Sequence, residues 1–376
     1  MKRSGPSGNL LPSILETFDQ AKLEALMRRF GELKAAVLGD FFLDKYLDVE
    51  PRLAEVSLET GRTAHQVVAV RHSPGAAGTV AANLATLMEL DRPGRRGPGG
   101  SILAIGFSGD DGEGWELRRD LEAIGVDTSR LATDRGAGRR TPVYLKPRCA
   151  DRPGLDGEHD RYDLKNRVPT GAGIESAAAA SARDLFDSLD LFIVMDQVED
   201  DGFGAVTPGL RLLLGSLVSA RKGPKPLAWA DSRRRIRAFS GFMCKMNEFE
   251  LMGVSDPEPG AAVADGEILR ALPGAEAAVG APVFVTAGSR GVWGNGPGGP
   301  FLVPAVNIEG PVDPTGAGDS FTAGAALALA SGACREEAAL VGCLVASVTV
   351  RKLGMTGTAT PGELKKALDI WKEQRS

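Results

Sequence analysis

Cysteine and histidine are scarce in this chain. Its 376 residues include 4 cysteines and 3 histidines. The cysteines form no Cys-x-x-Cys pair, which excludes the usual spacing of a zinc site and the dense pairing of a disulfide-stabilised secreted domain. So few histidines also give little support for a histidine-based triad or metal cluster. Scattered cysteines are typical of a reducing compartment, so we expect a cytoplasmic protein. The four are Cys149, Cys244, Cys334 and Cys343.

An excess of basic residues and a long apolar run are also missing. The 44 Lys and Arg against 49 Asp and Glu give a net charge of −5, so no general positive field attracts nucleic acid. Residues 1–30 carry charges throughout, and no secretory signal is expected. The longest apolar run, 338–350, contains Gly, Ser and Thr and is too short to span a bilayer. We therefore expect neither a nucleic-acid nor a membrane partner.

One stretch of small residues, VDPTGAGDSF at 312–321, precedes an Ala-rich run. Pro314 fixes its own backbone and holds Asp313 extended, while the two glycines let another molecule approach the chain. A loop that becomes a helix here would direct free N–H groups and the positive end of the helix dipole at an anion. Asp319 would lie in the first turn as a base, as phosphoryl transfer to an alcohol requires. The predicted anion hole consists of Gly316, Ala317 and Gly318.

A tight turn with Asp319 as a helix cap is the structural alternative. The whole pattern Asp-x-Thr-Gly-Ala-Gly-Asp at 313–319 is more specific, and it resembles the signature of the ribokinase (PfkB) family of carbohydrate kinases. The resemblance implies that Asp319 is the catalytic base and that the Gly-Ala-Gly run is the anion hole. It also implies K⁺ beside the hole, held by Asp313 and Thr315. An Asx-type turn at Asp313 is the alternative to that cation site.

Two acids follow the first apolar strand, 35–39. Ligands gather at the carboxyl ends of strands in parallel α/β sheets, so Asp40 and Asp44 are predicted to bind sugar hydroxyls. A turn cap and a solvated acid are the alternatives. The Gly-rich turn and helix at 74–84 resemble the family's second motif, but Ala replaces its second Gly and Thr stands where Asn is usual, which leaves the sugar open. The predicted sugar contacts in this segment are Gly75, Ala76 and Thr79.

The segment 247–250 matches the family's Asn-x-x-Glu motif. If it starts a helix, Asn247 and Glu250 share a face and could hold water around Mg²⁺. The same pattern is a capping box, which is a purely structural alternative.

Residues 283–292 resemble the family's nucleotide loop, Thr-x-Gly-x-x-Gly, although an ordinary hairpin explains them as well. The resemblance implies that a late helix at 336–353 lies beside adenine. The residues predicted to contact ATP are Thr286, Gly288, Gly291 and Ser347.

Strands and helices alternate from 35 to 371, which predicts a three-layer α/β/α sandwich on a mainly parallel sheet, as in ribokinase-like proteins. Segments near 64–70 and 140–146 do not alternate with helices and are predicted to form a small β-sheet lid. Residues 1–34 are predicted to be a tail and a helix over 13–33, ahead of a kinase domain at 35–376. A homodimer through the lid is a further expectation.

The sequence therefore predicts ATP-dependent phosphorylation of a hydroxyl on a sugar or sugar phosphate, with Mg²⁺ and K⁺ as cofactors. The start at 39–44 and the segment 161–166 look most like the heptose-phosphate-kinase branch of the family. Two alternatives stay open. One is a catalytically silent regulator that binds sugar or nucleotide, and the other is a nucleoside kinase.

Overall fold

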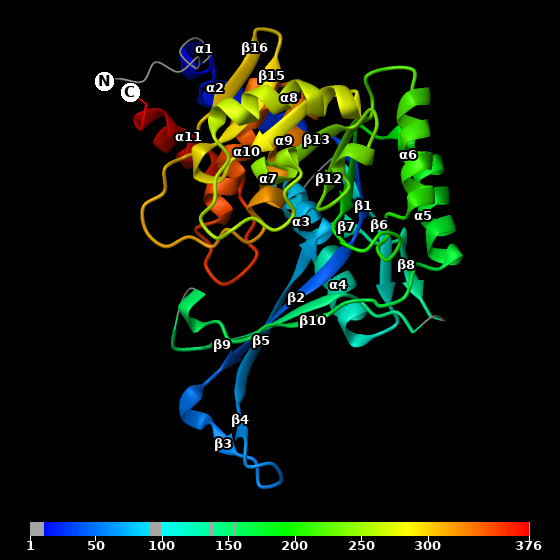
Figure 1. Ribbon diagram of the computed structural model, residues 1–376, viewed down its shortest axis with the longest axis vertical. Coiled ribbons are helices and arrows are strands. Elements are labelled where there is room, and N and C mark those ends of the chain that lie inside the picture. Colours follow the sequence, from blue (N-terminus) through cyan, green and yellow to red (C-terminus); the bar gives the residue numbers. More distant parts are fainter. Residues whose placement is uncertain (1–10, 91–98, 136–137, 153–154, 376) are drawn as a thin grey trace.

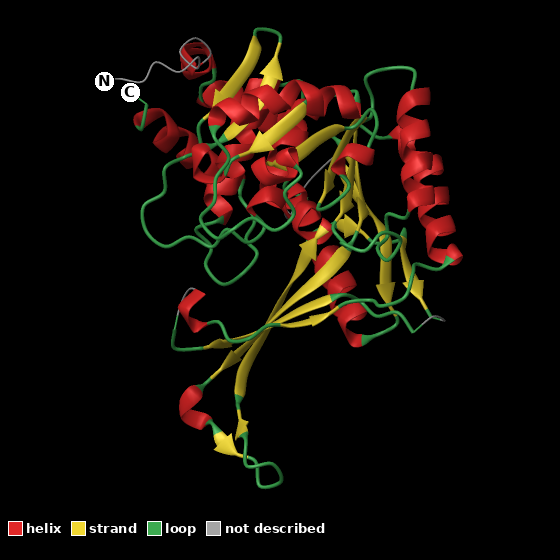
Figure 2. Cartoon of the chain, viewed as in Figure 1, coloured by secondary structure: helices red, strands yellow, loops and turns green. Residues whose placement is uncertain are grey.

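The computed structural model describes residues 11–90, 99–135, 138–152 and 155–375. Its body is a ten-stranded sheet covered by helices on both faces, and a smaller sheet extends away from the body (Figures 1 and 2). The predicted three-layer α/β/α fold with a small β-sheet lid is confirmed. Within the described residues, no helix combines the length and apolar character needed to cross a membrane.

The strands of the large sheet follow the order β16-β15-β14-β13-β12-β11-β1-β6-β7, and β8 pairs with β6. All pairs from β14 to β7 are parallel, as is β6 with β8, whereas β14-β15-β16 is an antiparallel edge. The carboxyl ends of β1 and β11 to β14 therefore meet along one edge of the sheet. The strands are β1 (Lys34–Gly39), β6 (Ser101–Gly109), β7 (Val126–Asp127), β8 (Leu131–Asp134), β11 (Leu191–Asp196), β12 (Leu227–Ser232), β13 (Met243–Asn247), β14 (Val283–Thr286), β15 (Val292–Gly296) and β16 (Gly299–Val303).

Side chains of the central strands alternate between two cores because successive strand residues point to opposite faces. In β1, Ala35 and Val37 belong to one apolar cluster, and Ala36 and Leu38 to the other. The first cluster includes α1 (Leu11–Thr17), α2 (Gln20–Phe30), α3 (Ala77–Leu87), α4 (Gly112–Ala123), α9 (Ala317–Ala330), α10 (Arg335–Thr349) and α11 (Pro361–Glu373). The second includes α5 (Ala172–Leu185), α6 (Pro208–Ala220), α7 (Glu248–Met252) and α8 (Asp265–Val279).

The lid is a four-stranded sheet in the order β10-β9-β2-β5. Strand β2 pairs antiparallel with β5 and parallel with β9, and a two-stranded hairpin extends the lid at its far end (Figure 1). These strands are β2 (Phe41–Val49), β3 (Glu55–Val56), β4 (Thr63–Ala64), β5 (Val67–Ala76), β9 (Val143–Cys149) and β10 (Tyr162–Leu164). Short 3₁₀ turns occur at η1 (Pro51–Leu53), η2 (Leu155–Gly157), η3 (Phe186–Ser188), η4 (Ile236–Ala238) and η5 (Gly288–Arg290).

One local prediction was wrong. The single helix expected over 13–33 is broken into α1 and α2, because Asp19 caps α2 by accepting the Lys22 N–H at 2.8 Å. The sequence placed Asp40 and Asp44 together at the end of the first strand, and the structure shows that residues 41–49 form β2, the central link of the lid. Asp44 is consequently a lid residue, and the lid therefore supplies one of the two acids predicted to bind sugar.

Candidate active site

Helix α9 begins directly after a glycine in the left-handed conformation. Gly316 has a φ of 74° and is the N-cap of α9, a backbone shape that other residues rarely adopt. The Ala317 N–H donates to the Pro314 carbonyl at 3.1 Å. That bond leaves the N–H groups of Gly318 and Asp319 at the open end of the helix, where the dipole favours an anion.

Asp313 ties this loop to the turn that follows α10. Its Oδ1 accepts the Thr315 N–H at 3.0 Å and its Oδ2 accepts the Gly354 N–H at 3.3 Å. The Asp313 N–H donates to the Val350 carbonyl at 2.8 Å. The bond to Thr315 is the Asx-type turn that was the alternative to K⁺ binding. Because both carboxylate oxygens hold backbone groups, Asp313 supports the loop from behind, and a role in binding K⁺ stays a prediction.

Asp319 stands at the boundary between two cavities. It lines a wide groove of about 780 Å³ and a smaller cavity of about 160 Å³. Burial and the neighbouring Asp231 carboxylate raise the pKa of Asp319 to about 7, against the lowering effect of Lys245 and Arg233. A carboxyl whose pKa lies near neutrality can accept a proton during a reaction and release it afterwards.

A buried ion pair lies beneath the open end of α9. Asp231 and Lys245 occupy paired positions on β12 and β13, and their charged atoms are 2.9 Å apart. Thr322, one turn into α9, donates to Asp231 at 3.2 Å. A side chain at Gly318 would come within 3.0 Å of the Lys245 Nζ. Burial opposes the charge on Lys245, but the carboxylates of Asp231, Glu250 and Asp319 together outweigh it, and the pKa of Lys245 is raised. Lys245 therefore places a positive charge directly at the open end of the helix.

The smaller cavity lies between the lid and the body, and we call it the acceptor cavity. Asp44 on β2 pairs with Lys146 on β9 at 3.1 Å and accepts the Thr356 hydroxyl at 2.9 Å. Lys146 also lies over the Tyr46 ring, 5.1 Å from its centroid. The cavity is lined by Phe42, Asp44, Ala76, Thr79, Tyr144, Lys146, Arg161, Gln197, Arg233, Thr315, Gly316, Asp319 and Thr356.

The residues predicted to contact sugar divide into two groups. Asp44, Ala76 and Thr79 line the acceptor cavity. Gly75 does not, but a side chain there would come within 3.0 Å of the Asp44 carboxylate, so glycine leaves room for that group. Asp40 is buried and engaged elsewhere. Its oxygens accept three backbone N–H groups, from Gln197 at 2.7 Å, Val198 at 3.0 Å and Ala205 at 2.7 Å.

The geometry therefore favours a structural role for Asp40 over its predicted contact with substrate. Burial and the charge of Asp196 raise the pKa of Asp40 to about 6, although the three N–H groups lower it. Its carboxylate holds residues 197–205 against the end of β1, and Gln197 in this segment lines both the wide groove and the acceptor cavity.

The wide groove, which we call the donor groove, runs along the carboxyl ends of β12 and β13. Lys245 and Asn247, two residues apart on β13, both line it, as expected for side chains on one face of a strand. Gly316, Gly318 and Asp319 also line it. The groove therefore includes the anion site.

Asn247 and Glu250 form the capping box that the sequence left as the structural alternative. The Asn247 Oδ1 accepts the N–H groups of Phe249 and Glu250 at 2.9 and 2.8 Å, and the Glu250 Oε2 accepts the Asn247 N–H at 2.6 Å. Both side chains also line the donor groove. The cap does not use the second carboxylate oxygen of Glu250, which could therefore face a hydrated cation, and the magnesium role stays a prediction.

The predicted ATP contacts lie near this groove but do not line it. Thr286 is the strand partner of Asn247, and its hydroxyl lies 3.5 Å from the Met246 carbonyl. A side chain at Gly291 would come within 2.1 Å of the Val303 carbonyl, so the hairpin itself requires glycine there. Gly288, with a φ of 56°, begins the short turn between β14 and β15. The Ser347 hydroxyl donates to the Leu344 carbonyl at 2.7 Å inside α10. Their contacts with ATP remain untested predictions.

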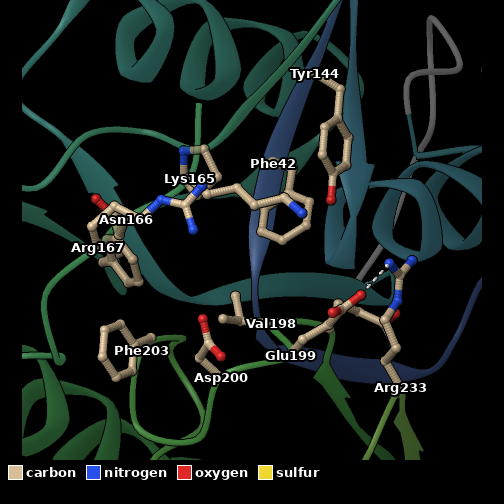
Figure 3. Close-up of a pocket in the computed structure, with 13 residues that line it drawn as sticks. Phe42, Tyr144, Lys165, Asn166, Arg167, Val198, Glu199, Asp200, Phe203 and Arg233 are labelled. Carbon is tan, nitrogen blue, oxygen red and sulfur yellow. Dashed lines mark ion pairs between the residues drawn. The ribbon is translucent and has the colours of Figure 1, made fainter. Parts of the chain in front are cut away.

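A third cavity of about 140 Å³ adjoins the acceptor cavity (Figure 3). The two share Phe42, Tyr144, Gln197 and Arg233. Aromatic rings wall this side cavity, and charged side chains of both signs stand around it. In addition to the shared residues it is lined by Phe107, Pro142, Lys165, Asn166, Arg167, Val198, Glu199, Asp200 and Phe203.

Sequence reasoning assigned no role to several side chains that line these cavities. Gln197 and Asp231 lie at the carboxyl end of a strand or just beyond it, which is a general signal for a binding position. Lys146 had no such signal, because its partner Asp44 is about a hundred residues away in sequence and meets it only through the pairing of β2 with β9.

Comparisons with known proteins agree with this geometry. Residues 241–361, which include the anion loop and part of the donor groove, match the model of the pfkB family of carbohydrate kinases. The chain is 28% identical over 360 residues to the Bifunctional protein HldE of Trichlorobacter lovleyi, covering 94% of this chain and 66% of that protein. For the Bifunctional protein HldE of Caulobacter vibrioides the identity is 29%, over 91% of this chain and 65% of the relative. The chain thus spans just under two thirds of the length of these relatives.

Solved structures show the same fold. The phosphofructokinase-2 of Escherichia coli, in complex with potassium, superposes with a TM-score of 0.65 at 18% identity, covering 90% of this chain and 99% of that one. The ribokinase of Arabidopsis thaliana, complexed with ribose and ATP, gives a TM-score of 0.61 at 18% identity and the same coverage. Residues 241–361 thus match the model of the pfkB family of carbohydrate kinases, and the chain has the ribokinase-like fold of these solved structures.

Proposed function

We propose that the protein transfers the γ-phosphoryl group of ATP to a hydroxyl of a sugar or sugar phosphate. The observation that carries this proposal is the position of Asp319. It lies in the first turn of a helix whose open end faces an anion site, and it lines both the donor groove and the acceptor cavity. A base between a phosphate site and a polar cavity is the arrangement that phosphoryl transfer to an alcohol requires.

In the proposed reaction the polyphosphate lies along the donor groove with its end at the anion loop. Asp319 accepts the proton of the attacking hydroxyl, and the oxygen of that hydroxyl bonds to the γ-phosphorus while the bond to the ADP oxygen breaks. The N–H groups of Gly318 and Asp319 and the Lys245 ammonium stabilise the negative charge of the group in transit. Gly316 allows the close approach because it has no side chain.

The charges in the acceptor cavity favour an anionic acceptor. Three cationic side chains, Lys146, Arg161 and Arg233, line it against the carboxyl groups of Asp44 and Asp319. Lys165 and Arg167 add two more cations beside the side cavity (Figure 3). We therefore propose a sugar phosphate as the acceptor, and a heptose phosphate first, as the resemblance of segments 39–44 and 161–166 implies.

A sugar panel tests this function. The full-length protein is incubated with ATP and Mg²⁺ and with ribose, fructose 6-phosphate or a heptose phosphate, and ADP release is measured by a coupled assay. We expect ADP release that requires an acceptor and is fastest with a phosphorylated sugar. Absence of acceptor-dependent ADP release would favour a silent regulator.

Magnesium is the first cofactor proposed, and the donor set fits it. Glu250 and Asn247 offer a carboxylate oxygen and an amide next to the anion site, which suits a cation that keeps several waters. When bound, Mg²⁺ would neutralise charge on the phosphates.

We predict that Glu250→Gln raises the Mg²⁺ concentration needed for half-maximal activity several-fold. Glutamine can still accept the Asn247 N–H, so the cap persists and the melting temperature should change little. A large drop in melting temperature with unchanged Mg²⁺ dependence would favour a purely structural role.

Potassium is the second cofactor proposed. Asp313 supports the anion loop from behind and could share a cation with nearby carbonyl groups, since its oxygens each bond a single N–H group. We predict that activity rises with K⁺ and that Asp313→Ala abolishes the rise. Equal rates in KCl and in tetramethylammonium chloride at matched ionic strength would contradict this and leave Asp313 as a loop support only.

The lid presents an exposed apolar surface that suits a second copy of the chain. Val68 and Val70 on β5 are 53% and 52% exposed, and Val56 on the projecting hairpin is 69% exposed. We propose a homodimer through this surface, because clustered exposed apolar side chains usually mark an interface. Sedimentation should give a dimer that Val68→Lys with Val70→Lys converts to a monomer, and a wild-type monomer at micromolar concentration would contradict it.

We also propose a cytoplasmic location, where ATP is available and the four free cysteines stay reduced.

A further inference from the structure

The three cavities meet at two side chains. Gln197 and Arg233 line the donor groove, the acceptor cavity and the side cavity alike. The Gln197 amide is directed at Asp231, with its Nε2 3.4 Å from the Asp231 Oδ1. Arg233 is therefore the cation that stands where a donor phosphate, an acceptor hydroxyl and the far end of the acceptor would come together.

The other two cations of the acceptor cavity are firmly held. Lys146 is buried in its ion pair with Asp44. Arg161 makes two bonds to Asp163, at 2.7 and 3.0 Å, and lies 4.6 Å from the centroid of the Tyr144 ring. Neither is placed to follow a group that moves from donor to acceptor.

Arg233 has a fixed backbone and a loosely held side chain. Its N–H donates to the Asp196 carbonyl at 3.1 Å, and the turn after β12 is braced by the Ser232 hydroxyl, which donates to Asp196 at 2.7 Å. Its guanidinium forms an ion pair with Glu199 at 3.6 Å, drawn as a dashed line in Figure 3, and the side chain is 48% exposed. A pair this long and this exposed contributes little free energy, so it can be exchanged at small cost for a phosphate.

The neighbouring arginines are placed differently. Arg235 is bound to both oxygens of Asp196, at 2.7 and 3.1 Å, and serves the fold. Arg234 also reaches Glu199, at 3.4 Å, and faces the donor groove, but it does not line the acceptor cavity. Arg233 thus differs from both in reaching the acceptor side.

The positive charge of Arg233 affects the pKa of side chains in the proposed reaction site. Burial and Asp231 raise the pKa of Asp319, and the charge of Arg233 lowers it, after the larger lowering effect of Lys245. The charge of Arg233 also lowers the pKa of Tyr144 in the acceptor cavity, where burial acts in the opposite direction and prevails. The guanidinium is consequently close enough to interact with groups on both sides of the proposed transfer.

Building on the proposed kinase function, we infer that Arg233 is a catalytic residue that leaves Glu199 and binds the phosphoryl group in transit between donor and acceptor. The oxygen of the acceptor hydroxyl forms its bond to the γ-phosphorus, the bond to the ADP oxygen breaks, and the proton passes to Asp319. Arg233 exchanges no proton. It donates N–H groups to the equatorial phosphoryl oxygens, whose charge it balances, as arginines supplied in cis do in other phosphoryl-transfer sites.

The test compares Arg233→Ala with Arg130→Ala in the full-length protein, using whichever of ribose, fructose 6-phosphate or a heptose phosphate gives the fastest wild-type ADP release. Loss of Arg233 should lower kcat by about 100-fold or more, the usual effect of removing one donor to a developing negative charge. Arg130 forms a similarly long and exposed ion pair, with Asp184 at 3.5 Å, and lines none of the three cavities. Arg130→Ala should therefore leave kcat within about threefold of wild type. Arg233→Lys should recover only part of the rate, because an ammonium cannot contact two oxygens in one plane.

A binding measurement adds a quantity that would stay unchanged if Arg233 had only a structural role. Calorimetric titration with ADP and aluminium fluoride, in the presence of the same acceptor, reports affinity for a mimic of the moving phosphoryl group. Arg233→Ala should weaken that affinity about tenfold or more while ADP alone binds as in wild type. A kcat within about threefold of an active wild type overturns the role of Arg233 alone. An inactive wild type overturns the kinase proposal and this inference with it.

Discussion

Asp319→Asn should lower kcat by a factor of about 10²–10⁴ while ATP still binds, because a general base contributes acceleration of that size. The amide has nearly the shape of the carboxylate but cannot take the proton of the acceptor hydroxyl. Turnover is measured with the best acceptor of the sugar panel, and ATP affinity by equilibrium titration in the absence of acceptor. Near-normal turnover would show that another group removes the proton and that Asp319 is not the base.

The stability of the same variant provides its control. The pKa of Asp319 is raised to about 7 in the folded protein, whereas an unfolded aspartate titrates near 3.9. The carboxyl therefore favours the folded state in its protonated form, and that contribution is lost as pH rises through about 7. Asparagine carries no charge at any pH. Asp319→Asn should accordingly be more stable than wild type at pH 8 and equally stable near pH 4, which would exclude misfolding as the cause of lost activity.

The second large effect concerns the buried pair beneath the anion site. Lys245→Met would leave Asp231 buried without a counterion and close to Asp319, and breaking such a pair typically costs about 3–5 kcal/mol of unfolding free energy. Turnover should fall as well, since Lys245 is the cation next to Gly318. Denaturant unfolding at pH 8 and kcat at saturating ATP measure the two effects.

Two further variants separate charge from packing. The double variant Asp231→Asn with Lys245→Met removes both charges and should recover much of the stability but not the turnover. Lys365→Met removes a cation from a pair with Glu24 whose side chains are 41% and 42% exposed, so it should change the unfolding free energy very little. If Lys245→Met is as stable as Lys365→Met, the buried pair of Asp231 and Lys245 does not contribute the unfolding free energy expected of it.

What the sequence could predict depended on how local the signal was. Asp319 and its glycines lie within four residues, and the loop-to-helix geometry could be predicted from Pro314, the glycines and the alanines after them. The catalytic interpretation of Asp319 rested on the resemblance of 313–319 to a family signature. The capping box at 247–250 was also a local pattern. There one sequence satisfied a structural and a functional interpretation at once, and the structure shows the hydrogen bonds of the first.

Interactions between distant segments could not be predicted in the same way. The pairing of β2 with β9, and the packing of the turn after α10 against the lid, bring together Asp44, Lys146 and Thr356. No spacing in the sequence predicts that contact. Asp40 shows the opposite error. A strand-end acid next to a site is a reasonable ligand, but here its oxygens are taken by backbone N–H groups more than 150 residues away. Long-range hydrogen bonds of this kind decide whether an acid serves the fold or a ligand.

The most direct test of the central claim follows the phosphorus atom itself. Phosphorus NMR of the full-length protein with ATP, Mg²⁺ and the best acceptor should show the γ-phosphate resonance lost as a sugar-phosphate resonance appears in equal amount, with no transfer in Asp319→Asn. If the γ-phosphate appears instead as inorganic phosphate at a rate independent of the acceptor, or if the Asp319 variant transfers it as fast as wild type, the assignment of Asp319 as the base between donor groove and acceptor cavity is wrong.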